Sequence, residues 1–363
     1  MTPTTCPPRS FARALPCVLA TLFACDGAAP SAHRGLEVRP SSLTAPGTLF
    51  GDNLTRPAGG VWLGAHLWFS DNLEYFLRLD ATPSGLFEPD QGFRATGIAD
   101  GADASGPTAT HLFKPGQPAF DAAAAVVYVP DFNNRTAGVW RLTWDAAHER
   151  VLSQGTILAP GLGLAGLRPT SAALGPDGSL YVGSLNTPDV KRVTTPAGAT
   201  QTVQTIGKAS GRRIFGMAFV GSSLYLAESN GLSVIRNAAS CQSGCNATPV
   251  AGVAAVETSG LATDGGDNLW LIQAPNVLRY TVSSGSAAFF ASQGTLPPGY
   301  TPLTSMFDGG VSGCAGSTCT FTFAPGQPNL LALDSGGGLI VGEDPGLLNP
   351  VGPTSFCGRL WRF

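Results

Sequence analysis

A short apolar pattern recurs six times along the chain and predicts the same element each time. In every copy the first and third residues are aliphatic or Phe, the second is aromatic in five of six, and the fourth is small in five of six. The copies are residues 67–71, 127–131, 180–184, 224–228, 269–273 and 339–343. Because both sides of such a segment are apolar, the pattern predicts a β-strand buried on both faces. The small fourth residue predicts a closely approaching neighbouring backbone.

Further strand-like segments flank these copies. A short apolar run and a tight turn precede most of them, as in residues 171–174 followed by Gly175-Pro-Asp-Gly178, and this order predicts a hairpin. A third strand carrying an arginine follows each copy, and a fourth follows in most. The arginines are Arg78, Arg141, Arg192, Arg236, Arg279 and Arg362. The linker at residues 113–118 (FKPGQP) recurs as 323–328 (FAPGQP), so a second repeat agrees with the first.

Six units of four short antiparallel strands predict an all-β fold, a six-bladed β-propeller. The chain ends in the third strand of the sixth unit, so we expect an N-terminal strand within residues 35–53 to complete that blade and close the ring. The propeller is predicted to span residues 43–363. The longest intervals between units place insertions near residues 81–117 and 293–327.

The chain resembles the six-bladed propellers that group NHL-repeat proteins with the senescence-marker-protein and gluconolactonase family. The residues that carry the likeness are 173–182 with 191–193, and 260–271 with 278–280. The resemblance covers roughly residues 57–363 and is specific for the architecture. It is weak for activity, since propellers serve in binding, scaffolding, hydrolysis and isomerisation.

The N-terminus has the pattern of an export signal. Arg9 and Arg13 precede an apolar run at residues 14–24, which is too short to span a bilayer. Residues 22–25 (LFAC) resemble the lipobox of bacterial lipoproteins, so residues 1–24 are predicted to be a signal peptide and Cys25 the lipidated residue. An ordinary secretory signal cleaved nearby is the alternative. Residues 25–42 are predicted to be an Ala/Pro/Ser-rich tether, and the protein to be exported and lipid-anchored to the bacterial cell envelope.

The composition argues against one class of partner and bears on the state of the cysteines. With 21 Lys+Arg against 24 Asp+Glu, the formal net charge is −3, which argues against a nucleic-acid partner. Export permits disulfides, and we favour the pairs Cys241–Cys245 and Cys314–Cys319, which leave Cys357 unpaired. Zinc is the rival interpretation, but no His lies near either pair.

The fifth residue of every copy bears oxygen and is expected at one mouth of the central channel. These residues are Asp71, Asp131, Ser184, Glu228, Gln273 and Glu343. Such a ring could hold Ca²⁺ or another divalent cation. The resemblance points the same way, because gluconolactonases bind a divalent cation near the axis through Glu, Asn and Asp. The nearest candidates for metal ligands are Asp131, Asn186, Glu228, Glu343 and Asp344. The alternative is that these polar residues hydrogen-bond local backbone at turns.

Two functions from different classes remain, and a structural partner in a larger envelope assembly is a third possibility. The first is a cell-envelope lipoprotein whose propeller binds an unknown protein, glycan or small-molecule ligand without catalysis. The alternative is a divalent-cation-dependent lactone or ester hydrolase of the gluconolactonase type. The strand arginines are expected to serve packing and ion pairing rather than to form an anion-binding stripe. The sequence contains no G-x-S-x-G, H-E-x-x-H or Walker motif and assigns no catalytic residue.

Overall fold

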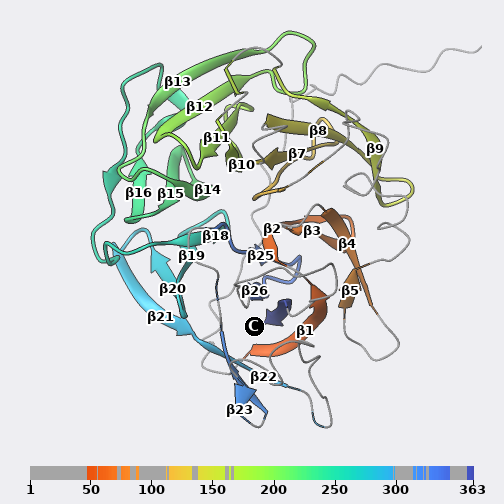
Figure 1. The fold of residues 1–363 in the computed structure, drawn as a ribbon. Coiled ribbons are helices and arrows are strands. Elements are labelled where there is room, and N and C mark those ends of the chain that lie inside the picture. The colour runs from red at the N-terminus through yellow and green to blue at the C-terminus, as the bar shows by residue number, and fades with distance from the viewer. Residues whose placement is uncertain are drawn as a thin grey trace, which may run out of the picture. The chain divides into compact units, whose positions relative to one another are not determined.

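Six four-stranded antiparallel blades surround an axis in the computed structural model (Figure 1). The structure describes residues 47–54, 56–71, 75–81, 87–89, 112, 114–132, 138–159, 163–164, 167–296, 298, 314–315, 317–321, 323, 327–343 and 358–363. The predicted signal peptide, Cys25 and the tether lie outside these residues. No helix in the described ranges is long and apolar enough to cross a membrane. The predicted all-β propeller is confirmed.

The strands follow one another from the axis outward within each blade. Blade one contains β2 (Pro57–Leu63), β3 (His66–Asp71), β4 (Tyr75–Ala81) and β5 (Phe87–Pro89). Blade two contains β6 (Ala119–Asp121), β7 (Val126–Asp131), β8 (Gly138–Asp145) and β9 (Arg150–Ile157). Blade three contains β10 (Pro169–Leu174), β11 (Leu180–Ser184), β12 (Asp189–Thr194) and β13 (Thr202–Lys208).

The remaining blades repeat this order. Blade four contains β14 (Ile214–Val220), β15 (Ser223–Glu228), β16 (Gly231–Ile235) and β17 (Thr248–Pro249), with a 3₁₀ turn η1 (Ala238–Ser240) before β17. Blade five contains β18 (Ser259–Thr263), β19 (Asn268–Gln273), β20 (Asn276–Thr281) and β21 (Ser286–Ala291). Blade six contains β25 (Leu331–Leu333), β26 (Leu339–Glu343), β27 (Gly358–Arg362) and β1 (Gly47–Leu54).

Burial decreases outward within a blade, as the sequence pattern requires. In blade three all of β11 is buried, β12 has three buried and three partly buried residues, and the first residue of β13 is exposed. The recurrent pattern therefore marks the second strand, which neighbouring blades cover on both sides.

The hydrophobic core lies between the blades rather than within them. Buried apolar residues gather in six clusters, and each cluster joins two adjacent blades. One cluster packs Phe69 of blade one against Ile340 and Leu360 of blade six, so the last blade packs against the first. Because each sheet buries its faces only against its neighbours, stability depends on the whole ring.

Small residues at the fourth position of the second strand allow the next blade to approach. A Cβ atom added at Gly183 would lie 2.6 Å from Cγ2 of Ile214, on the innermost strand of blade four. At Gly342 it would lie 2.6 Å from Cβ of Leu330 and 3.1 Å from Cβ of Pro57. Larger side chains would push neighbouring blades apart.

Blade six combines strands from both ends of the chain. β1 pairs antiparallel with β27, with Thr48 opposite Arg362 and Leu49 opposite Trp361. β1 also pairs with β5 of blade one, and with β22 (Gln293–Thr295) of the segment between blades five and six. β22 continues through β24 (Thr318–Thr320) to β23 (Cys314–Ala315), which widens this sheet to 11 strands.

Candidate functional site

The six oxygen-bearing residues predicted at the axial mouth all lie at the ends of second strands and are buried. Their exposed fractions are 0% for Asp71, Asp131, Glu228 and Glu343, 1% for Ser184 and 7% for Gln273. Each residue therefore has to satisfy its polar atoms inside the protein.

Two of the aspartates hold the linkers that lead into their own blades. Oδ1 of Asp71 accepts a hydrogen bond of 3.0 Å from the backbone N–H of Arg56, just before β2. Oδ1 of Asp131 accepts one of 3.0 Å from the N–H of Lys114, before β6. Ser184 also bonds to the linker before its own blade, but as a donor: its hydroxyl donates to the carbonyl of Leu167 before β10.

Glu228 makes the densest set of these contacts. Its carboxylate accepts from the N–H of Ser210 at 3.2 Å and from the Ser210 hydroxyl at 2.8 Å. The N–H of Gly211 and the hydroxyl of Ser233 also donate to it. Both carboxylate oxygens of Glu228 are thereby bonded within blade four and the linker before β14.

The last two members complete the series in different ways. Nε2 of Gln273 donates to the carbonyl of Ala254 at 2.9 Å and to Oγ1 of Thr258 at 3.0 Å, both in the linker before β18. Glu343 instead accepts from β27: Nη2 of Arg359 and Nε1 of Trp361 each lie 3.0 Å from one of its oxygens. The Glu343–Arg359 ion pair is buried, with side chains 0% and 4% exposed.

These contacts bear on the predicted cation ligands. Asp131, Glu228 and Glu343 each bond within their own blade or its linker, whereas Asn186 is exposed and its N–H donates to the Ser184 hydroxyl at 3.0 Å. Asp344 lies outside the described residues. Across the ranges that the structure describes, no three His, Cys, Asp or Glu residues gather where they could hold a metal ion. The predicted cation site remains a prediction. Five of the six fifth-position residues bond to the linkers before their own blades, a role close to the alternative of hydrogen bonding to local backbone.

Gln117 fills the space where the innermost strands meet. Its backbone bonds to β10, with N–H to the Thr170 carbonyl at 2.8 Å and C=O to the N–H of Ala172 at 3.0 Å. Its side-chain amide donates to the carbonyls of Met217 at 3.0 Å and Leu261 at 3.3 Å, and accepts from the N–H of Met217 at 3.0 Å. The backbone and side chain of this one residue thus join blades three, four and five.

Gln117 belongs to the repeated linker of residues 113–118 and 323–328, and this repeat is the sequence signal for its structural role. A Cβ added to Gly59 of blade one would lie 2.5 Å from Cα of Gln117, so blade one also packs against this residue. Gln117 therefore occupies the space between the innermost strands of these blades.

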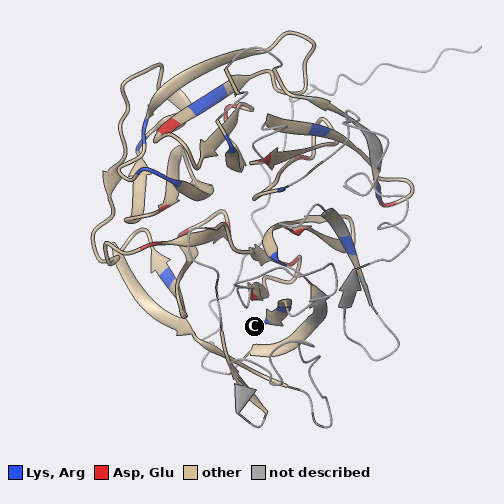
Figure 2. Ribbon diagram, in the orientation of Figure 1, with Lys and Arg blue, Asp and Glu red and all other residues tan. Residues whose placement is uncertain are grey.

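Arginines on the third strands of blades one to three bridge to the next blade. Arg78 Nη1 donates to the carbonyl of Glu149 at 3.3 Å, and Arg141 Nη1 to those of Ala197 and Gly198 at 3.3 and 3.2 Å. Arg192 Nη1 donates to the Cys241 carbonyl at 3.0 Å. Each acceptor lies in the connection between the third and fourth strands of the following blade. Figure 2 shows charged segments scattered over the blades rather than gathered into one stripe.

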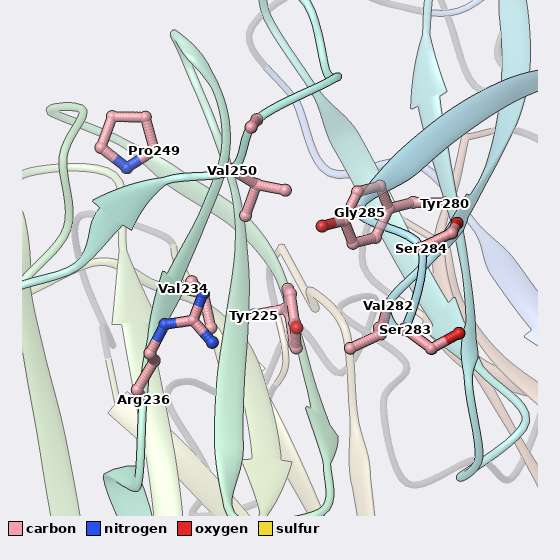
Figure 3. A pocket seen from close by; sticks show the side chains of 11 residues that line it. Tyr225, Val234, Arg236, Pro249, Val250, Tyr280, Val282, Ser283, Ser284 and Gly285 are labelled. Carbon is pink, nitrogen blue, oxygen red and sulfur yellow. The ribbon is translucent and has the colours of Figure 1, made fainter.

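A pocket of about 350 Å³ lies between blades four and five (Figure 3). Blade four contributes Tyr225, Val234, Arg236 and residues 249–251, and blade five contributes Tyr280 and residues 282–285. In blade five the lining includes the turn between the third and fourth strands, and in blade four it includes the end of the third strand and the residues at the end of the fourth. No sequence pattern marks this pocket, because its lining residues come from two stretches that are separated along the chain and include both strand and turn positions.

Two tyrosines form facing walls of this pocket. The ring centroids of Tyr225 and Tyr280 are 6.3 Å apart, and the two side chains are only 4% and 6% exposed. Burial raises the pKa of both phenols, Arg236 partly offsets this effect, and Asp267 adds to it. Both hydroxyl groups therefore keep their protons at neutral pH and remain hydrogen-bond donors.

The cysteines behave partly as the sequence suggests. Cys241 and Cys245 form a disulfide that closes the loop beside η1. Cys319 is disulfide-bonded, and its Cα lies opposite that of Cys314 in the β23–β24 hairpin. The Cys314–Cys319 pairing remains a prediction, and Cys357 lies outside the described residues.

No protein-family model matches this chain, and no curated protein is similar to it in sequence. Among solved structures, a protein of unknown function from Bacteroides thetaiotaomicron is 14% identical with a TM-score of 0.53, over 86% of this chain and 71% of that one. A gluconolactonase from Xanthomonas campestris is 15% identical with a TM-score of 0.51, over 86% and 87%. The PQQ-bound aldose sugar dehydrogenase of Streptomyces coelicolor is 14% identical with a TM-score of 0.50, over 86% and 95%.

This chain folds as a six-bladed β-propeller. At these identities the likeness establishes the fold of the propeller alone, which is shared with gluconolactonases and sugar dehydrogenases. The chemistry has to be argued from its own residues.

Proposed function

We propose that this protein is a non-catalytic binding module of the bacterial cell envelope, exported and anchored through a lipid on Cys25. Its propeller binds a protein, glycan or small molecule. One observation carries the proposal: the polar groups at the axial mouth are bonded to the backbone and side chains of their own blades. Such groups serve the fold and have little capacity left for a substrate.

The two buried glutamates illustrate the argument. A general acid or base, or a metal ligand, has to offer an oxygen to the substrate or ion. Glu228 already accepts hydrogen bonds from three residues, and Glu343 is paired with Arg359. Breaking the buried pair to free Glu343 would leave an unpaired charge, at a cost of about 3 to 5 kcal/mol.

The experiment is calorimetric titration of the mature protein in detergent with Ca²⁺, Mn²⁺ and Zn²⁺, together with an assay of gluconolactone hydrolysis. We expect no saturable cation binding and no hydrolysis above the uncatalysed rate. Stoichiometric cation binding that supports lactone hydrolysis, and that Glu228→Gln or Glu343→Gln abolishes, would instead establish the lactonase alternative. The lipid anchor is tested by fractionating cells that express the protein. Cys25→Ser is expected to move the protein out of the membrane fraction.

A further inference from the structure

The pocket between blades four and five exists because one groove lacks the arginine that fills its counterparts. Across the second and third strands, Tyr128 lies opposite Arg141 and Tyr181 lies opposite Arg192. In blade four, Tyr225 lies opposite Val234, and Arg236 comes two residues later. No guanidinium at this register therefore reaches the turn between β20 and β21, and the groove stays open. Arg236 follows the last residue of β16, so the prediction that every third strand carries an arginine is wrong for blade four.

Arg236 brings an unneutralised positive charge to the open groove. Its side chain is exposed and lines the pocket from blade four, facing Tyr280 and Val282 of blade five (Figure 3). Within the part of the chain that the structure describes, it makes no hydrogen bond or ion pair. The nearby Asp267 bonds to the N–H of Ser283 at 2.6 Å and to the Ser283 hydroxyl, so that carboxylate is held by its own blade. The charge of Arg236 thus favours an anion.

The tyrosines add donors to the same space. Among the described residues, neither the Tyr225 hydroxyl nor the Tyr280 hydroxyl has a hydrogen-bond partner, and both belong to pocket-lining side chains. A guanidinium fork and two phenolic O–H groups can together satisfy the oxygens of a carboxylate. The rest of the lining includes the apolar side chains of Val234, Val250 and Val282.

We propose that the pocket between blades four and five binds a small organic carboxylate with an apolar body. The volume of about 350 Å³ falls at the lower end of ligand pockets, which suits a single ring or a short chain. The proposal deepens the proposed binding function by naming one site and its ligand class. The carboxylate contacts Arg236 and the tyrosine hydroxyls, and the apolar body occupies the position that arginine side chains fill in blades two and three.

The test is titration of the mature protein with benzoate, and with benzamide and benzamidine as neutral and cationic analogues of similar shape. We expect saturable binding of benzoate and at least about tenfold weaker binding of both analogues, because they lack the charge that pairs with Arg236. Arg236→Met should weaken benzoate binding by about tenfold or more. Arg279→Met is the matched control, since Arg279 does not line the pocket, and it should leave the affinity unchanged.

Val234→Arg provides a second, independent variant. It places in blade four the residue that blades two and three already accommodate at this register, so the protein should fold, with an unchanged or raised melting temperature, and lose benzoate binding. The proposal is overturned if benzamidine binds in preference to benzoate, or if Val234→Arg folds and binds benzoate normally. If the protein binds no benzoate and hydrolyses no lactone, the proposed site is wrong and the proposed function stands. If it binds benzoate and also hydrolyses lactone with a cation, the proposed function is wrong and the site stands.

Discussion

The groove between blades three and four and the groove between blades four and five share one architecture but are filled differently. In the first, Arg192 is 7% exposed, lies opposite Tyr181 and bonds to the carbonyl of Cys241 in the next blade. In the second, Val234 takes that register and the space becomes a pocket. The contrast shows that a propeller can create a binding site by removing one bridging side chain, without changing its strands.

The largest expected effect comes from removing an arginine from each groove. Arg192→Ala leaves buried carbonyls without their donor and uncovers Tyr181, so the free energy of unfolding should fall by about 2 to 3 kcal/mol. Arg236→Ala should change it by no more than about 0.5 kcal/mol, because Arg236 is exposed. Chemical denaturation of both variants checks the difference. Equal losses would mean that the two arginines have the same structural role.

The second prediction concerns the loop to which Arg192 bonds. Replacing Cys241 and Cys245 together by serine opens the small disulfide loop, which should lower the free energy of unfolding by roughly 2 kcal/mol. Denaturation of the double variant measures this loss. Benzoate binding between blades four and five should survive, since neither cysteine lines that pocket. A loss of binding in folded protein would show that the two grooves are coupled.

The smallest effect at neutral pH concerns the tyrosines. Burial raises the pKa of Tyr181 to about 12 and also raises that of Tyr225, both from 10.0. Because the folded state holds these protons more tightly, the associated stability is fully present below pH 10 and is lost as the pH rises through the folded-state pKa. Denaturation as a function of pH should show a weaker alkaline loss in Tyr181→Phe than in wild type. Tyr225→Phe should reduce the loss less. An unchanged alkaline profile in Tyr181→Phe would refute this assignment.

The sequence predicted the blades well because each second strand is buried on both faces. That burial requires an uninterrupted apolar segment, and all six copies kept it. The sequence does not reveal which residue of the third strand lies opposite the aromatic residue of the second strand. The spacing from aromatic residue to arginine is the same in blades three and four, 192 − 181 = 11 and 236 − 225 = 11. The hairpin between β15 and β16 is tight, with Glu228 opposite Gly231, so the register in blade four shifts by two residues.

The candidate site was predictable in position but not in role. The fifth residues do end the second strands, as expected, and their polarity follows from the buried backbone groups of the linkers that they bind. The sequence does not distinguish a carboxylate that bonds to a linker from a carboxylate that binds a cation. The role of Gln117 was equally hidden, since its partners Met217 and Leu261 are 100 and 144 residues away. The lipid anchor at Cys25 and the role of Asp344 stay predictions.

The sequence by itself determined the number of blades, their strand order and the polar positions at the ends of the second strands, because local periodicity fixes which residues are buried. Only the tertiary structure decided that Gln117 occupies the axis and that one groove stays open. Those outcomes depend on turn lengths and on contacts between blades. In blade four a register shift of two residues places Val234 instead of Arg236 opposite Tyr225, so the guanidinium lies at the edge of an open groove.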